Sequence, residues 1–147
     1  MANIRNLAEA STPFGPAGLR AGLEAYEAAD VARVAVTAFA RIAEAWKLGN
    51  VVAADLISVS PRTWARMKTG QWSGSLDRDQ LLRISALTGL YKALHLYFSD
   101  TLADRWPGLP NSGPLFANRS PLEVMRAGGL PAILQARGYV DALRGGL

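Results

Sequence analysis

The sequence predicts an all-α protein in which a helix-turn-helix domain is followed by a small C-terminal helical module. Apolar residues recur three and four positions apart through most of the 147 residues, as they do along one face of a helix. Runs of β-branched residues are short, and Ser60-Pro61 and Ser120-Pro121 are typical helix starts. We therefore divide the chain into three parts. Residues 1–29 form an N-terminal arm that is partly helical or flexible. Residues 30–105 form the helix-turn-helix and dimerisation region, and residues 106–147 form the C-terminal module.

The arm and the first long helix differ in composition. Residues 1–29 contain a Pro/Gly cluster between Pro13 and Pro16 and then a short acidic helical piece, so we expect a loose arm. The helix that follows is expected to begin at Asp30 and to end at Gly49-Asn50, which are typical helix stops. The spacing of its apolar residues predicts an inward face of Val31, Val34, Ala38, Ile42 and Trp46.

The segment 51–70 has the core pattern of a helix-turn-helix. A short helix is predicted over 51–57, followed by a tight turn at Ser58, a position where glycine is common because it favours positive φ. The second helix starts at Ser60-Pro61 and ends at Gly70. The pattern consists of small residues where the two helices approach and of apolar residues on their inner faces. These residues are Ala53, Ala54, Ile57, Val59, Trp64 and Met67.

Further helices and a long connection complete the predicted fold. An apolar stripe over 81–98 indicates a helix, which Gly89 can break in two. Residues 106–118 are rich in Pro, Gly and Asn, which predicts a connection with little regular structure. Ser120-Pro121-Leu122-Glu123 is a capping box that starts a helix ending at Gly128-Gly129. A last helix follows, and its buried side chains are expected to be Ile133, Leu134 and Val140.

The polar residues of the second helix of the motif are predicted to face outward, because its apolar residues face inward. Residues 34–76 carry five basic and two acidic residues, a net +3 of the chain's +4. Arginine can read guanine through two hydrogen bonds, and Ser and Thr suit a phosphate or a thymine methyl group. The predicted contacts to double-stranded DNA are Ser60, Arg62, Thr63, Arg66, Lys68 and Gln71. Three cations per chain bind weakly, so we expect a homodimer on half-sites about 34 Å apart. The alternative is an ordinary helical hairpin with a solvated basic face.

Composition excludes most catalytic and metal chemistry. The chain has no cysteine and a single histidine, His95, which excludes thiolate metal sites, cysteine nucleophiles and most His-based triads. His95 is expected to be a partly buried structural residue, Asp77 and Asp79 to cap a helix, and Asp100 and Asp104 to be solvated. We therefore predict no enzyme activity, no cofactor and no metal. No stretch approaches the ~20 apolar residues of a membrane span and no signal-peptide pattern is present, so we expect a cytoplasmic location.

Two stretches together are similar to a known family. The first comprises the helix-turn-helix residues 53–64, then Leu81-Leu82-Arg83 and Leu96-Tyr97-Phe98. The second comprises Trp106, Pro110-Asn111, Arg119-Ser120-Pro121-Leu122-Glu123, Gly128-Gly129 and Tyr139. In this order they resemble the Xre/MbcA/ParS-like antitoxins of prokaryotic toxin–antitoxin pairs, over about residues 30–147. The connection 112–118 is longer than in that family, and residues 1–29 match nothing in it.

The resemblance implies a function that composition and spacing do not. Proteins of this family bind and neutralise a RES-domain toxin that consumes NAD⁺, using the C-terminal module, and repress the shared operon as dimers through the helix-turn-helix. We expect the toxin contacts to lie in the last segment, at Arg137, Tyr139, Asp141, Arg144, Gly145, Gly146 and Leu147. The alternative for this segment is a frayed helix end. The alternative for the chain is a stand-alone transcriptional repressor without a toxin partner. A third possibility, a small helical enzyme, is disfavoured because the chain lacks the residues for general acid–base catalysis.

Overall fold

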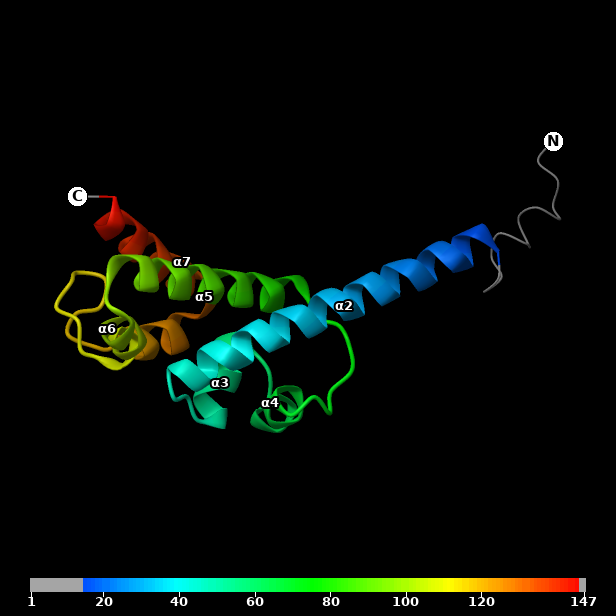
Figure 1. The fold of residues 1–147 in the computed structure, drawn as a ribbon, viewed down its shortest axis with the longest axis horizontal. Helices are drawn as coiled ribbons and strands as arrows, with labels where there is room; N and C mark the ends of the chain where they lie inside the picture. The colour runs from blue at the N-terminus through cyan, green and yellow to red at the C-terminus, as the bar shows by residue number, and fades with distance from the viewer. Residues whose placement is uncertain (1–14, 146–147) are drawn as a thin grey trace.

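The structure, a computed structural model, describes residues 15–145, and this part of the chain is built from helices without strands. The all-α prediction is therefore confirmed. The elements in order are α2 (Pro16–Ala45), α3 (Asn50–Ile57), α4 (Pro61–Lys68), α5 (Arg78–Tyr97), α6 (Asp100–Arg105), the short 3₁₀ helix η1 (Trp106–Gly108) and α7 (Pro121–Arg144). Helix α5 packs against α7 and α2, and α3 and α4 form a hairpin below the C-terminal half of α2 (Figure 1).

Helix α2 is longer than predicted, because it starts at Pro16 and not at Asp30. Proline fits the first position of a helix, and the Ala-, Leu- and Glu-rich residues after it are good helix formers. The remainder of the predicted arm, residues 1–14, lies outside the described residues. The predicted inward face is also wrong in its first half, since Val31 and Val34 are 52% and 58% exposed. The helix turns a neighbouring face inward, made of Ala32, Val36, Phe39, Ile42 and Ala43.

The helix-turn-helix forms as predicted. Ser58 ends α3 in the left-handed region, with φ 59° and ψ 49°, so a serine adopts the conformation for which glycine is usually selected. The Ser60 side chain caps α4 by accepting a hydrogen bond from the backbone N–H of Thr63, and Pro61 follows at the first helical position. Trp64 is 2% exposed and packs edge-on against Phe39 of α2, with 5.0 Å between ring centres. The hairpin is thus fixed to the core through the inner face of α4.

Helix α5 runs without a break through Gly89, contrary to the prediction that the glycine interrupts it. The buried side chains Leu87 and Leu90 on either side hold the helix in the core. Gly89 has a packing role instead, because a Cβ there would lie 2.4 to 2.7 Å from the guanidinium atoms of Arg137 on α7. The absence of a side chain at Gly89 therefore leaves room for the guanidinium group of Arg137.

Helix α7 consists of two helical pieces that meet at Gly129, whose φ of 65° and ψ of −151° are not helical. This confirms the predicted stop at Gly128-Gly129, although the second piece follows without a gap. Ser120 accepts a hydrogen bond from the Glu123 N–H at 3.2 Å, as expected for the start of the first piece. In the second piece Ile133 and Val140 are buried as predicted, but Leu134 is 50% exposed because it lies on the outer side of the helix.

Candidate functional site

The exposed face of α4 is the first candidate site. Arg62 and Arg66 are exposed and stand four residues apart, so they lie on one face of the helix, opposite the buried Trp64 and Met67. In the described part of the chain neither arginine forms an ion pair with a carboxylate. Lys68 is also exposed, and its Nζ donates a hydrogen bond to Asn50 Oδ1 at 2.7 Å. The helix therefore presents unneutralised cations to solvent.

The other predicted DNA contacts lie around these cations. The Ser60 and Thr63 hydroxyl groups are 2.9 Å apart and hydrogen-bonded to each other, in addition to the helix cap. Gln71 is exposed at the far end of α4, and its backbone oxygen accepts a hydrogen bond of 3.5 Å from Arg66 Nη2. Ser60, Arg62, Thr63 and Arg66 thus lie along α4, with the two hydroxyl groups already partly satisfied. Lys68 is instead turned toward Asn50 at the start of α3, and Gln71 lies beyond the end of α4.

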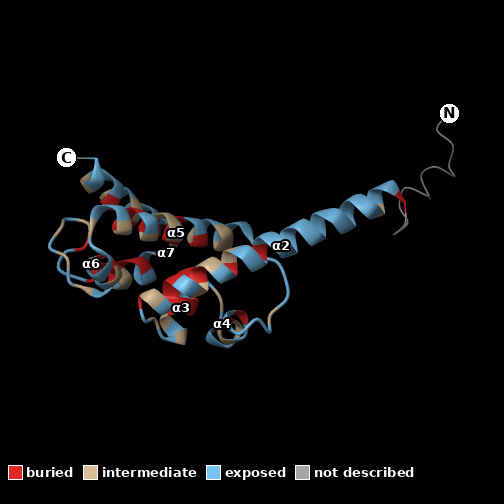
Figure 2. Ribbon diagram, in the orientation of Figure 1, coloured by how far each residue is buried: buried red, intermediate tan, exposed pale blue. Residues whose placement is uncertain are grey.

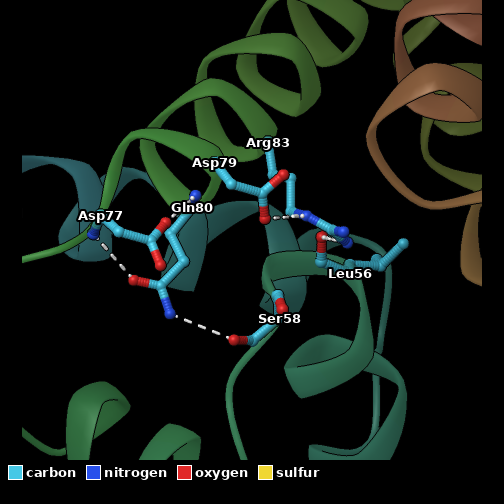
Figure 3. A network of polar contacts seen from close by, with 6 residues as sticks. All are labelled: Leu56, Ser58, Asp77, Asp79, Gln80 and Arg83. Atoms are coloured by element: carbon cyan, nitrogen blue, oxygen red, sulfur yellow. Dashed lines mark hydrogen bonds and ion pairs between the residues drawn. The ribbon is translucent and has the colours of Figure 1, made fainter.

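A polar network behind the hairpin holds the turn in place (Figure 3). Asp77 and Gln80 form a reciprocal capping box at the start of α5, with hydrogen bonds of 2.8 and 3.0 Å. The Gln80 amide nitrogen then donates to the backbone oxygen of Ser58 at 3.1 Å. The backbone carbonyl of Ser58 at the turn therefore has a hydrogen-bond donor in Gln80 of α5, which lies 22 residues later in the chain. These hydrogen bonds tie the turn of the motif to the start of α5.

Two arginines connect the same region to the rest of the protein. Arg83 on α5 forms a 2.8 Å ion pair with Asp79, and its guanidinium lies 3.5 Å from the backbone oxygen of Leu56 at the end of α3 (Figure 3). Arg126, just before the kink of α7, forms a 2.9 Å ion pair with Asp55 of α3. No local sequence pattern predicted a site at these residues. An ion pair thus connects the C-terminal module to α3, the first helix of the helix-turn-helix.

The predicted partner-binding segment lies at the end of α7. The Tyr139 ring stacks on Trp106 with 6.4 Å between centres and meets Phe116 edge-on at 5.1 Å. Tyr139 therefore helps to build the module as well as lying at its surface. Arg137 and Asp141 form a loose ion pair of 3.8 Å and are about half exposed. Arg144 and Gly145 are exposed, whereas Gly146 and Leu147 lie outside the described residues.

A second charged cluster joins α5 to α6 and corrects one prediction. Asp100 and Asp104 do not act only as solvated carboxylates, because their oxygens lie 2.9 Å from His95 Nδ1 and 2.8 Å from His95 Nε2. Carboxylates only accept hydrogen bonds, so both contacts are satisfied when the ring carries two protons. Partial burial lowers the pKa of His95, but the hydrogen bonds and charges of the two carboxylates outweigh it, and the pKa is raised above 6.5. Burial and the same charges raise the pKa of Tyr91, which packs against the His95 ring.

Neither a metal site nor a membrane helix is visible in the described residues. Across residues 15–145, His, Asp and Glu side chains form no group of three or more that could hold a metal ion. None of the helices there is sufficiently long and apolar to cross a membrane.

Comparison with known proteins places these features in context. Residues 25–89 match the model of the antitoxin Xre-like helix-turn-helix domain. The chain is 36% identical over 120 residues to the uncharacterized protein y4oB of Sinorhizobium fredii, covering 80% of this chain and 91% of that protein. Its fold is similar to that of a chain in the crystal structure of the M. tuberculosis MbcT–MbcA toxin–antitoxin complex, with a TM-score of 0.53 and 21% identity. That match covers 76% of this chain and 95% of the other.

Proposed function

This chain belongs to the Xre/MbcA-like antitoxin family, and on that premise we propose two activities for it. The C-terminal module neutralises a RES-domain toxin that consumes NAD⁺, and α4 binds DNA to repress the chain's own operon. The two activities use surfaces on opposite parts of the chain. The observation that carries the DNA-binding half is the division of α4 into an inner face with Trp64 and an outer face with Arg62 and Arg66.

Duplex DNA is the ligand that the outer face of α4 fits best. Arg62 lies in the first turn and Arg66 one turn later, so both side chains reach the same side of the helix. In a helix-turn-helix the N-terminal part of the second helix contacts base edges in the major groove. The polar network from Asp77 and Gln80 to Ser58 fixes the turn before DNA arrives, which lowers the ordering cost of binding.

The end of α7 is the surface that we assign to the toxin. Arg137, Asp141 and Arg144 are exposed or half exposed there, next to the anchored Tyr139. A cleft that holds the phosphates of NAD⁺ needs cations, and the Asp141 carboxylate can pair with such cations in place of the phosphates. Gly145 and Gly146 add no side-chain bulk after α7, which suits a confined entrance. Neutralisation would then block the dinucleotide site directly.

Variants at exposed positions separate the two activities without removing core residues. Asp141→Lys combined with Arg144→Glu is expected to raise the Kd for a RES-domain toxin at least tenfold and to leave operator binding unchanged. Arg62→Ala combined with Arg66→Ala is expected to weaken operator binding and to leave the Kd for the toxin unchanged. Glu44→Lys, an exposed charge reversal on α2, is the matched control and should change neither activity.

The measurements are toxin-catalysed NAD⁺ loss and fluorescence anisotropy of a labelled operator fragment. Loss of both activities in either double variant, with its helix content unchanged, would contradict the separation of the two surfaces. Unaltered toxin inhibition by the Asp141 and Arg144 variant would contradict the position assigned to the toxin contact.

A further inference from the structure

Helix α2 is exposed over its N-terminal half and becomes buried toward its C-terminal end, where it lies against the rest of the fold (Figures 1 and 2). At this end Trp46 is 7% exposed and packs against Tyr91 of α5, with 6.3 Å between ring centres. The Nε1–H group of Trp46 has no hydrogen-bond acceptor within residues 15–145, and no other fully buried side-chain nitrogen or oxygen in that range lacks a partner. A buried N–H without a partner is costly, so this indole is an exception that needs a physical reason.

A pocket of about 430 Å³ lies beside the Trp46 ring. Its walls come from the end of α2, from α6 and η1, and from the start of α7, so it lies between α2 and the C-terminal module. The apolar part of its lining consists of Ala45, Pro107, Leu109 and Leu122. Small-molecule sites have volumes of roughly 300–1,000 Å³ and combine apolar walls with a few polar groups. This pocket is therefore of the size that holds a ligand with a single ring.

Two cations line the same pocket. Lys47 and Arg105 are exposed, and neither forms an ion pair with a carboxylate in the part of the chain that the structure describes. The lining contains one carboxylate, Asp104, and its Oδ1 lies 2.8 Å from His95 Nε2. The residues around the pocket thus have a net charge of +1, which matches a ligand with a single negative charge.

The backbone at Lys47 is unusual for a lysine. Lys47 follows α2 with a φ of 54°, and the Leu48 N–H donates to the Ala43 oxygen at 2.9 Å while the Lys47 N–H donates to the Glu44 oxygen at 3.0 Å. This is the Schellman motif, in which glycine is the usual residue because the left-handed region strains other residues. The lysine supplies a cation at the pocket that the usual glycine would not.

We propose that this pocket binds a small organic monocarboxylate. The carboxylate lies between Lys47 and Arg105 and accepts a hydrogen bond from the Nε1–H of Trp46. One group then satisfies the orphan donor and both cations, since a carboxylate only accepts hydrogen bonds and pairs well with a guanidinium. A phosphate dianion fits less well, because Asp104 repels its second charge and the remaining walls are apolar.

The site is separate from the surfaces proposed for the operator and for the toxin. Its ligand contacts α2 on one side and α6, η1 and α7 on the other. A ligand that binds only the folded chain stabilises it, so occupancy fixes the C-terminal module against the end of α2. The proposal therefore adds a small-molecule site to the two macromolecular surfaces.

The first experiment uses benzoate as the probe and the indole N–H signals of the full chain as the readout. The chain has four tryptophans, and Trp46→Phe identifies the Trp46 signal in a ¹H–¹⁵N spectrum. Benzoate is expected to shift that signal saturably to higher proton frequency, with a Kd of about 1 mM for a ligand of this size. Benzamide, its neutral isostere, and inorganic phosphate are expected to bind at least about fivefold more weakly. An unshifted Trp46 signal at about 20 mM benzoate, or equal binding of benzamide, would overturn the proposal.

The second experiment separates the side chain of Lys47 from its backbone. Lys47→Gly suits the left-handed conformation and removes the cation, so the urea midpoint is expected to be equal to that of the wild type or higher. Its Kd for benzoate should rise about fivefold. Arg41→Ala removes one charge from an exposed position of α2 outside the pocket and should leave that Kd unchanged. Equal benzoate affinity of wild type and Lys47→Gly, or an equal loss in Arg41→Ala, would contradict the site.

Discussion

Replacing Arg62 and Arg66 by alanine tests the assignment of α4 through the salt dependence of DNA binding. Each chain carries three exposed cations on or beside this face, Arg62, Arg66 and Lys68, so the homodimer expected from the sequence carries six. If each neutralises one phosphate, log K falls with log salt with a slope of about −5.4, since each contact contributes ~−0.9. The double variant keeps only Lys68 in each chain, which predicts a slope of about −1.8.

These slopes predict a large difference between the two proteins. Between 50 and 200 mM salt the wild type should lose about 10³-fold in affinity, and the double variant only about tenfold. Fluorescence anisotropy with a labelled operator fragment at four salt concentrations measures both slopes. The control carries Arg105→Ala and Arg119→Ala, an equal loss of charge at exposed positions away from α4. Equal slopes for wild type and double variant would refute the assignment of α4 to DNA.

Three further predictions concern stability, measured by urea unfolding. Trp64→Ala should lower the free energy of unfolding by about 3–5 kcal/mol, because the ring is 2% exposed and contacts the core of α2; a loss below ~1 kcal/mol would show that α4 does not depend on this contact. Gly129→Ala should cost ~1–3 kcal/mol because its φ is 65°, whereas Gly138→Ala, in open space within α7, should be neutral or stabilising. His95→Gln should remove a pH-dependent contribution to the free energy of unfolding, because the two carboxylates raise the pKa of His95 in the folded protein despite its partial burial. The ion pairs of His95 therefore stabilise the fold fully below about pH 6.5 and are lost as the pH rises through the folded pKa. A stability difference between wild type and variant that does not shrink with rising pH would contradict this.

The helix boundaries that could be predicted depend on residues close together in sequence. Ser60-Pro61 and Ser120-Pro121 start helices because the cap accepts a hydrogen bond from the N–H three residues later, which is a local property. The helix stop predicted at Gly128-Gly129 has the same local origin, since glycine accepts the non-helical backbone conformation that Gly129 adopts. The inner residues Trp64 and Met67 followed from helical spacing together with the adjacent turn.

The face of α2 could not be predicted in the same way. Two sets of residues in this helix have helical spacing, one containing Val31 and Val34 and one containing Ala32, Val36 and Phe39. Spacing alone does not distinguish them, because each forms a continuous stripe. In the middle of the helix the core takes the set that contains Phe39, whereas Ile42 and Trp46 of the predicted face are buried at its end.

The polar links between distant elements were also absent from the prediction. Arg126 pairs with Asp55, 71 residues away, and Gln80 bonds to Ser58 across 22 residues. Nothing in the local sequence indicates such pairs, because they depend on how the helices pack. His95 is a partial exception, since Asp100 is only five residues away, but the short turn between α5 and α6 that joins them is not encoded in a recognisable pattern.

The central claim is that this chain is an antitoxin whose C-terminal module blocks a RES-domain toxin. The most direct measurement is the rate of NAD⁺ consumption by the RES-domain protein of the same operon, titrated with the purified full-length chain. The account predicts that consumption stops at a fixed molar ratio, and that a stable complex of the two proteins is isolated at that ratio. An undiminished rate at a saturating concentration of the folded chain would contradict it.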